Sequence, residues 1–141
     1  MSWLKKKSVL VPIDFSEVSY QAVGPAKEYV DEVSSLKLIH VLAPLHPADP
    51  AAIWGTISDD ERKHKVHEFL SKKLSEMGYE GAQIEVAIGD PVTKIIDYAK
   101  QVDADLIVVS SHERKEISRL LLGSVAERVV HLAPCPVLIL K

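Results

Sequence analysis

The hydrophobic pattern along the chain changes its period several times. Segments whose apolar residues recur every three or four positions, as in amphipathic helices, alternate with shorter apolar or alternating runs that are typical of strands. The strand-like runs are Ser8–Ile13, Leu36–Leu42, Gln83–Ile88, Asp105–Ser110 and Pro136–Leu140. This order predicts an α/β fold in which a five-stranded parallel sheet is covered by helices on both faces.

Residues that commonly cap helices mark where the helical segments begin. The hydroxyls of Ser16 and Ser58 and the carboxylate of Asp90 can each accept a hydrogen bond from a backbone N–H in a first helical turn. Pro91 suits the first position of a helix, where an N–H would have no partner. The apolar spacing then predicts helices from Ser16 to Val33, from Ser58 to Met77, from Asp90 to Ala99 and from Ser124 to Leu132.

A long loop separates the second strand from the second helix. Ala43–Thr56 contains three prolines and a glycine, which exclude a regular element. Trp54 lies in this loop, and a large aromatic side chain there can hold the loop on the core, cover a ligand or contact a partner. Of these roles, contact with the core is the one we expect.

Composition changes this picture little. The chain has 141 residues, which suits a single domain over residues 1–141, and its net charge of −3 offers no general attraction to nucleic acid or to an acidic membrane surface. Cys135 is the only cysteine and cannot form an internal disulfide. The chain shows no signal-peptide core and no apolar run of roughly 18 residues. We therefore expect a cytoplasmic protein without a nucleic acid or membrane partner.

The helix that starts at Gly123–Ser124 is a candidate for ligand binding. Backbone N–H groups at a helix start have no intrahelical partner, and the helix dipole adds partial positive charge there, so such a start attracts anions. Ligands of parallel α/β sheets bind at the carboxyl ends of the strands, where Asp14, Leu42 and Ser110 are expected. The alternative for Gly123–Ser124 is an ordinary helix cap.

The histidines give a weaker signal. His40 falls within a strand and is expected to be partly buried with a hydrogen-bond partner. His64 and His67 share a helix face beside Glu68, but a structural zinc site normally needs four ligands, so we expect a solvated face. His112 closely follows a strand, and its proximity to serines in sequence does not establish catalytic geometry.

Two stretches of the chain resemble the universal stress protein family. They are the tail Ser118–Leu140 and the opening strand and turn Val9–Ser16, and the strand at Asp105–Val109 fits as well. The resemblance covers essentially the whole chain. It implies a Rossmann-like α/β fold similar to that of the adenine nucleotide alpha hydrolases. It also implies frequent dimer formation and, in some members but not in others, ATP binding.

The resemblance further implies a nucleotide site. Members that bind ATP carry Gly, two residues, Gly, nine residues, and then Gly followed by Ser or Thr; here these positions are Ser110, Glu113, Gly123 and Ser124. The second half of the pattern matches and the first half does not. By resemblance, Asp14 would bind the ribose hydroxyls and the backbone of Val41 the adenine. The implied nucleotide-binding residues are Pro12, Asp14, Val41, Ser110, Glu113, Gly123, Ser124 and Val125.

Glu113 is the main departure from this pattern. Its carboxylate falls where a polyphosphate would lie, and like charges a few ångströms apart repel by roughly 1 kcal/mol even in water. Arg114, Lys115 and Arg119 are close in sequence and can offset this repulsion, or Glu113 can turn toward solvent. Asp14 also has an alternative role, because it can simply cap the first helix or turn.

The last strand is expected at an edge of the sheet. Val137, Leu138, Ile139 and Leu140 are apolar, and an exposed apolar edge needs a cover. A second copy of the chain can offer the same strand across a two-fold axis, as the resemblance also implies. The alternatives are cover by Met1–Lys7 or no cover.

Three functions stay open at this point. The first is a dimeric stress-response protein that binds ATP with Mg²⁺ as a sensor or switch, which Asp14, Gly123 and Ser124 favour. The second is a nucleotide-free dimeric adaptor for another protein, which Ser110 and Glu113 favour. The third is a slow Mg²⁺-dependent ATP hydrolase. Against this third function, the chain has no Gly-Lys-Ser/Thr motif and no paired carboxylates that indicate a two-metal site.

Overall fold

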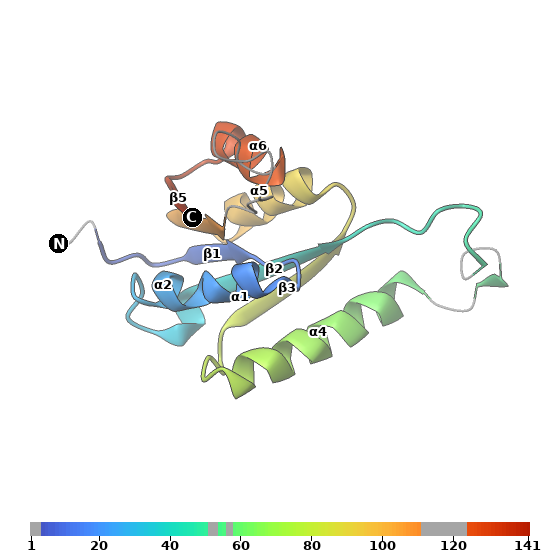
Figure 1. Ribbon diagram of the computed structural model, residues 1–141, viewed down its shortest axis with the longest axis horizontal. Coiled ribbons are helices and arrows are strands. Elements are labelled where there is room, and N and C mark those ends of the chain that lie inside the picture. The colour runs from blue at the N-terminus through green and yellow to red at the C-terminus, as the bar shows by residue number, and fades with distance from the viewer. Residues whose placement is uncertain (1–3, 51–53, 56–57, 111–123) are drawn as a thin grey trace.

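One parallel sheet forms the centre of the molecule. The computed structural model describes residues 4–50, 54–55, 58–110 and 124–141. Its strands lie in the order β3-β2-β1-β4-β5, all paired in parallel, so that β1 is central and β5 forms one edge (Figure 1). The predicted five-stranded α/β fold is confirmed, and each strand lies within one residue of its expected range. The strands are β1 (Val9–Pro12), β2 (Leu36–Leu42), β3 (Gln83–Ile88), β4 (Leu106–Ser110) and β5 (Val137–Leu140).

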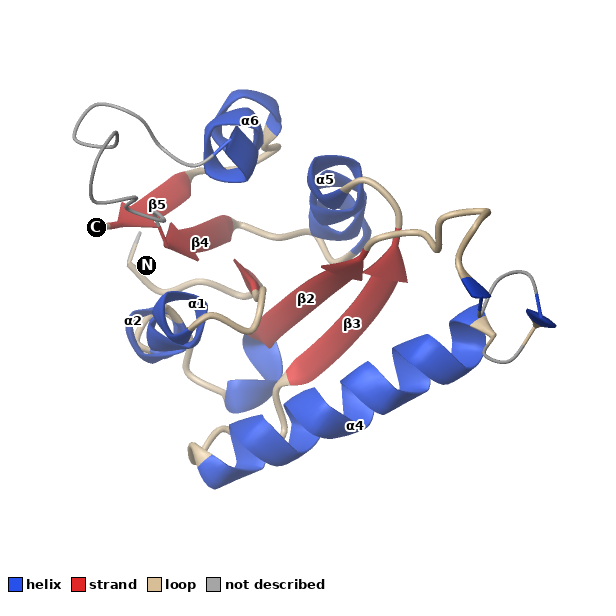
Figure 2. Ribbon diagram, turned by 45° about the vertical axis from the view of Figure 1, so that its right-hand side comes forward, coloured by secondary structure: helices blue, strands red, loops and turns tan. Residues whose placement is uncertain are grey.

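Helices cover both faces of this sheet, as the sequence predicts. α5 (Pro91–Gln101) and α6 (Ser124–Leu132) lie on one face (Figure 2). The other face is covered by α1 (Glu17–Gln21), α2 (Val23–Lys27) and α4 (Asp59–Glu76). The molecule therefore has three layers, with the sheet in the middle.

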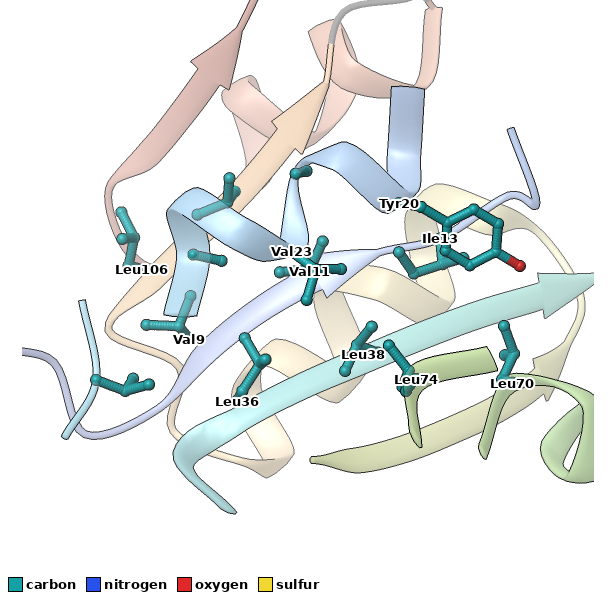
Figure 3. Packing of buried hydrophobic residues seen from close by; sticks show 14 residues of the cluster. Val9, Val11, Ile13, Tyr20, Val23, Leu36, Leu38, Leu70, Leu74 and Leu106 are labelled. Carbon is teal, nitrogen blue, oxygen red and sulfur yellow. The ribbon is translucent and has the colours of Figure 1, made fainter. Parts of the chain in front are cut away.

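Each face of the sheet has its own apolar cluster, because successive strand residues point to opposite faces. Figure 3 shows the first cluster, in which Leu74 of α4 lies beside Leu38 of β2, and Leu70 lies further along α4 toward Tyr20. The second cluster packs the other side of the strands against α5 and α6. Fully or nearly fully buried members of the second cluster are Leu10, Ile39, Val92, Ile95, Ile107 and Val129.

The cap predictions are confirmed, but the first helix is not continuous. Ser16, Ser58 and Asp90 each accept a hydrogen bond from a backbone N–H in the following helix. The single helix expected from Ser16 to Val33 is instead divided into α1, α2 and a short 3₁₀ turn, η1 (Val33–Ser35). Pro25 explains the first break, because it has no N–H to continue the helical hydrogen bonds across the junction.

Trp54 does not contact the core, contrary to expectation. Its side chain is 75% exposed. The loop that leaves β2 runs outward beyond the sheet toward the start of α4, as Figure 1 shows. Trp54 belongs to neither apolar cluster. In the described part of the chain, no helix is both long and apolar enough to cross a membrane.

Candidate functional site

The carboxyl ends of the strands form the edge at which a ligand site is expected; we call it the carboxyl edge. β1 pairs with β2 on one side and with β4 on the other, so the ends of these three strands are neighbours. Along the chain, β2 and β3 follow on one side of β1, and β4 and β5 then follow on its other side. The change of direction falls between β1 and β4, which is where ligands of such sheets bind.

Asp14 lies at this switch point with an exposed side chain. The Ile13 N–H still bonds to the Ile39 carbonyl at 2.8 Å, so the β1–β2 pairing ends one residue before Asp14. One Asp14 carboxylate oxygen, Oδ1, accepts hydrogen bonds from the Ser16 N–H at 3.0 Å and the Ser16 hydroxyl at 2.5 Å. Asp14 therefore does stabilise the turn, as the structural alternative predicts, and it does so while exposed at the carboxyl edge.

Two serines make the turn after Asp14 rigid. The Ser16 hydroxyl oxygen accepts a hydrogen bond from the Ser19 N–H at 3.1 Å and thereby caps α1. The Ser19 hydroxyl, which is 2% exposed, donates to the Ser16 carbonyl at 2.8 Å and accepts from the Asp14 N–H at 3.3 Å. The backbone around Asp14 is thus held from both sides.

Phe15 adopts a backbone conformation that is unusual for an aromatic residue. Its φ is +70°, in the left-handed region. Its ring lies 4.1 Å from the His40 ring, between centroids, and meets Phe69 of α4 edge-on at 5.5 Å. We call Phe15, His40 and Phe69 the aromatic cluster. It joins the β1–α1 turn to β2 and α4.

His40 is buried and has a hydrogen-bond partner, as predicted. It is 8% exposed, and its Nδ1 lies 2.6 Å from the Ile13 carbonyl oxygen, so Nδ1 carries the proton and donates it. The sequence pattern did not indicate its contact with Phe15. The only signal was a histidine at the same alternation in β2 as the buried Leu36 and Leu38.

The loop that leaves β2 is fixed by Arg62 of α4. The Nη2 of Arg62 donates to the Ala43 carbonyl at 2.8 Å, and its Nη1 lies 3.7 Å from Asp59 Oδ1. Although arginine is usually a surface residue, the Arg62 side chain is only 16% exposed. Val41, two residues before Ala43, is half-buried, packs on the second apolar cluster and pairs with Ala87 of β3.

The remaining predicted site residues are placed only in part. Pro12 and Ser110 are half-buried at the ends of β1 and β4. Ser124 begins α6, and Val125 is exposed in its first turn. Glu113 and Gly123, like His112, lie outside the described residues.

The start of α5 lies close to α6 through a charged pair. Asp90 Oδ1 is 3.8 Å from Arg128 Nη1, and Asp90 Oδ2 accepts hydrogen bonds from the backbone N–H and hydroxyl of Thr93 at 2.9 and 2.8 Å. These bonds, and to a lesser extent the Arg128 charge, lower the pKa of the Asp90 carboxyl. The charged form is therefore favoured by the fold.

Asp90→Asn should lower the melting temperature at neutral pH. A lowered folded-state pKa means that the stabilisation is present above the ordinary Asp value of 3.8 and is lost as the pH falls through the folded pKa. Asn remains a good N-cap, so the substitution mainly removes the charge. Thermal melts across this pH range should show a difference between the two proteins that disappears only in acid. Asp97→Asn, on the exposed face of the same helix, is the matched control; equal melting temperatures for wild type and Asp90→Asn at neutral pH would contradict the expectation.

Metal and thiol chemistry find little support. Among the described residues, no group of three or more His, Cys, Asp or Glu side chains is placed to hold a metal ion. His64 pairs instead with Glu68, at 2.6 Å between Nε2 and Oε1, as on a solvated helix face. Cys135 is half-buried against the second apolar cluster, and burial, followed by the charge of Asp105, raises the pKa of its thiol. A protonated thiol is a poor nucleophile.

The fold and the carboxyl edge define a parallel α/β domain of the kind that binds ligands where its strands end. The family model of the universal stress proteins matches residues 6–141, and the chain belongs to this family. It is similar to universal stress protein MJ0531 of Methanocaldococcus jannaschii, with 37% identity over 96% of this chain and 82% of the relative.

Two similar solved structures contain adenine nucleotides. One is a universal stress protein in complex with cAMP, with 27% identity, a TM-score of 0.62, and coverage of 97% of this chain and 98% of the other. The second is a universal stress protein family protein from Arabidopsis thaliana with AMP bound, with 26% identity, a TM-score of 0.60, and coverage of 96% and 91%. The family resemblance predicted from the sequence is confirmed.

Proposed function

We propose that this universal stress protein binds an adenine nucleotide, ATP with Mg²⁺, at the carboxyl edge and acts as a dimeric sensor or switch in the cytoplasm. The observation that carries the proposal is the exposed Asp14 carboxylate at the end of β1, beside the β1–β4 switch point. Its support from relatives is the presence of cAMP and AMP in two similar proteins.

Three parts of the carboxyl edge would share the ligand. The Asp14 carboxylate, whose oxygens accept hydrogen bonds, would accept them from the ribose hydroxyls. The backbone of Val41 would contact the adenine, and the start of α6 would attract the phosphates. Mg²⁺ is commonly held by substrate phosphates with only one or two carboxylates, so its binding does not require a protein cage.

Titration calorimetry of nucleotide-stripped protein with ATP and Mg²⁺ tests this proposal. We expect micromolar-range binding by the wild type. Glu113→Gly should bind more tightly, because it removes a negative charge from the neighbourhood that the resemblance assigns to the polyphosphate. Gly123→Val should abolish binding, because a branched side chain would prevent close approach of the phosphate to the backbone.

Two results would contradict these expectations. Equal affinity of wild type and Glu113→Gly would show that the Glu113 carboxylate does not face the phosphates. Absence of heat from the wild type up to millimolar ATP would overturn nucleotide binding. That second result would favour the other candidate, a nucleotide-free dimeric adaptor, which rests on Ser110 and Glu113 in place of the two glycines.

A further inference from the structure

The turn that carries Asp14 is held in a disfavoured conformation. Phe15 has a φ of +70°, and L-residues with a bulky side chain rarely adopt this region. Such a conformation persists only where the surrounding contacts determine it, and it is common at ligand sites. Contacts with neighbouring side chains are therefore needed to keep Phe15 in this conformation.

The aromatic cluster supplies those contacts. The ring of Phe15 lies against His40 with 4.1 Å between centroids and an angle of 35° between the planes. Phe69 meets the same ring at 89° and 5.5 Å, a favourable edge-to-face geometry. Phe15 is 41% exposed, and these two contacts pack its ring against β2 and α4.

His40 also holds the residue on the other side of Asp14. Its Nδ1 donates to the carbonyl of Ile13 at 2.6 Å, and Ile13 is 3% exposed. Asp14 therefore lies between two residues, Ile13 and Phe15, that the same imidazole contacts. In the chain, His40 directly precedes Val41, whose backbone is the expected adenine contact.

We propose that His40 and Phe15 are positioning residues of the nucleotide site: His40 ties the β1–α1 turn to β2 and thereby sets the Asp14 carboxylate relative to the Val41 backbone. This inference rests on the nucleotide binding proposed above. Neither side chain needs to touch the ligand. Their effect is on the ribose, because they fix the group that would accept the ribose hydroxyls, and not on the phosphates, which would bind at α6 on the other side of the switch point.

The test compares ATP with 2′-deoxy-ATP by titration calorimetry. Wild-type protein should prefer ATP, because the deoxy compound lacks one hydroxyl donor for Asp14. His40→Leu removes the hydrogen bond and the ring, and should weaken ATP binding about tenfold, the loss expected for one good hydrogen bond. Its affinity for 2′-deoxy-ATP should fall much less, so the preference for ATP should nearly disappear.

Two further variants separate positioning from folding. His40→Asn keeps an N–H donor close to the place of Nδ1, and should retain more of the ATP preference than His40→Leu. Phe15→Gly removes the ring but tolerates a positive φ, so it should fold normally and still lose part of the preference. Val18→Ala, which trims an exposed apolar side chain of α1, is the matched control and should bind both nucleotides like the wild type.

The outcomes are distinct. If His40→Leu and Phe15→Gly keep the wild-type preference, or lose affinity for both nucleotides equally, the positioning role is wrong while nucleotide binding stands. If the wild type binds neither nucleotide, nucleotide binding fails and the positioning role with it.

Discussion

Asp14→Ala should weaken ATP binding by at least about tenfold, because hydrogen bonds to a charged acceptor contribute about 1.5–3 kcal/mol each and two ribose hydroxyls are available. The carboxylate is exposed at the end of β1, so no rearrangement of the core is needed for a ligand to reach it. Titration calorimetry measures the effect directly, and 2′-deoxy-ATP should show a smaller loss than ATP.

A control is essential because Asp14 also stabilises its own turn. Ser16→Ala removes the hydroxyl that bonds to Asp14 and caps α1, but leaves the carboxylate in place. This variant should lose about 1 kcal/mol of stability, the usual value of an N-cap, and little ATP affinity. If Ser16→Ala instead loses as much affinity as Asp14→Ala, the carboxylate acts only through the turn. Asp31→Ala, an exposed acid paired with Lys5, controls for the change in charge.

The second large effect is expected at the sheet edge formed by β5. The wild type should have a mass in solution of twice the 15.6 kDa chain, and Ile139→Lys should reduce it to that of the single chain. All four residues of β5 are only half-buried in one copy of the chain, and strand pairing between two copies would cover them. A lysine on an edge strand opposes such pairing. Sedimentation equilibrium gives the masses.

The matched control places the same charge elsewhere. Leu132→Lys replaces an exposed apolar residue at the end of α6, 56% exposed, and should leave the dimer intact. A cooperative thermal melt of Ile139→Lys is needed to show that β5 still folds. A wild-type protein that sediments as a single chain, or an Ile139→Lys variant that stays dimeric, would contradict dimer formation through β5.

Local sequence patterns predicted the strands and most helix boundaries. Ser58 and Asp90 could be predicted as caps because a short polar side chain just before a helix can accept a hydrogen bond from a backbone N–H of its first turn. The prediction of one continuous helix from Ser16 to Val33 was wrong. The apolar spacing continues through Pro25, but the helical hydrogen bonds do not. The prediction that Trp54 contacts the core was also wrong. The type of residue does not indicate the direction in which a proline-rich loop leaves the sheet.

The candidate site was predictable only where it follows from topology. Asp14 could be placed at the carboxyl edge because it directly follows a strand of a parallel sheet. The aromatic cluster could not, because Phe15, His40 and Phe69 come from three separate elements and no short-range pattern connects them. The positive φ of Phe15 could not be predicted either, because a positive φ is usually indicated by a glycine.

The central position of β1 also has a consequence for how the chain folds. β1 can pair with β2 as soon as residues up to Leu42 exist, but its other neighbour is β4, with Val9 opposite Leu106. Closing so long a loop carries the larger entropic cost, and contacts between distant residues slow folding. During synthesis from the N-terminus, one side of the central strand therefore stays without its partner until the chain has been made as far as Leu106.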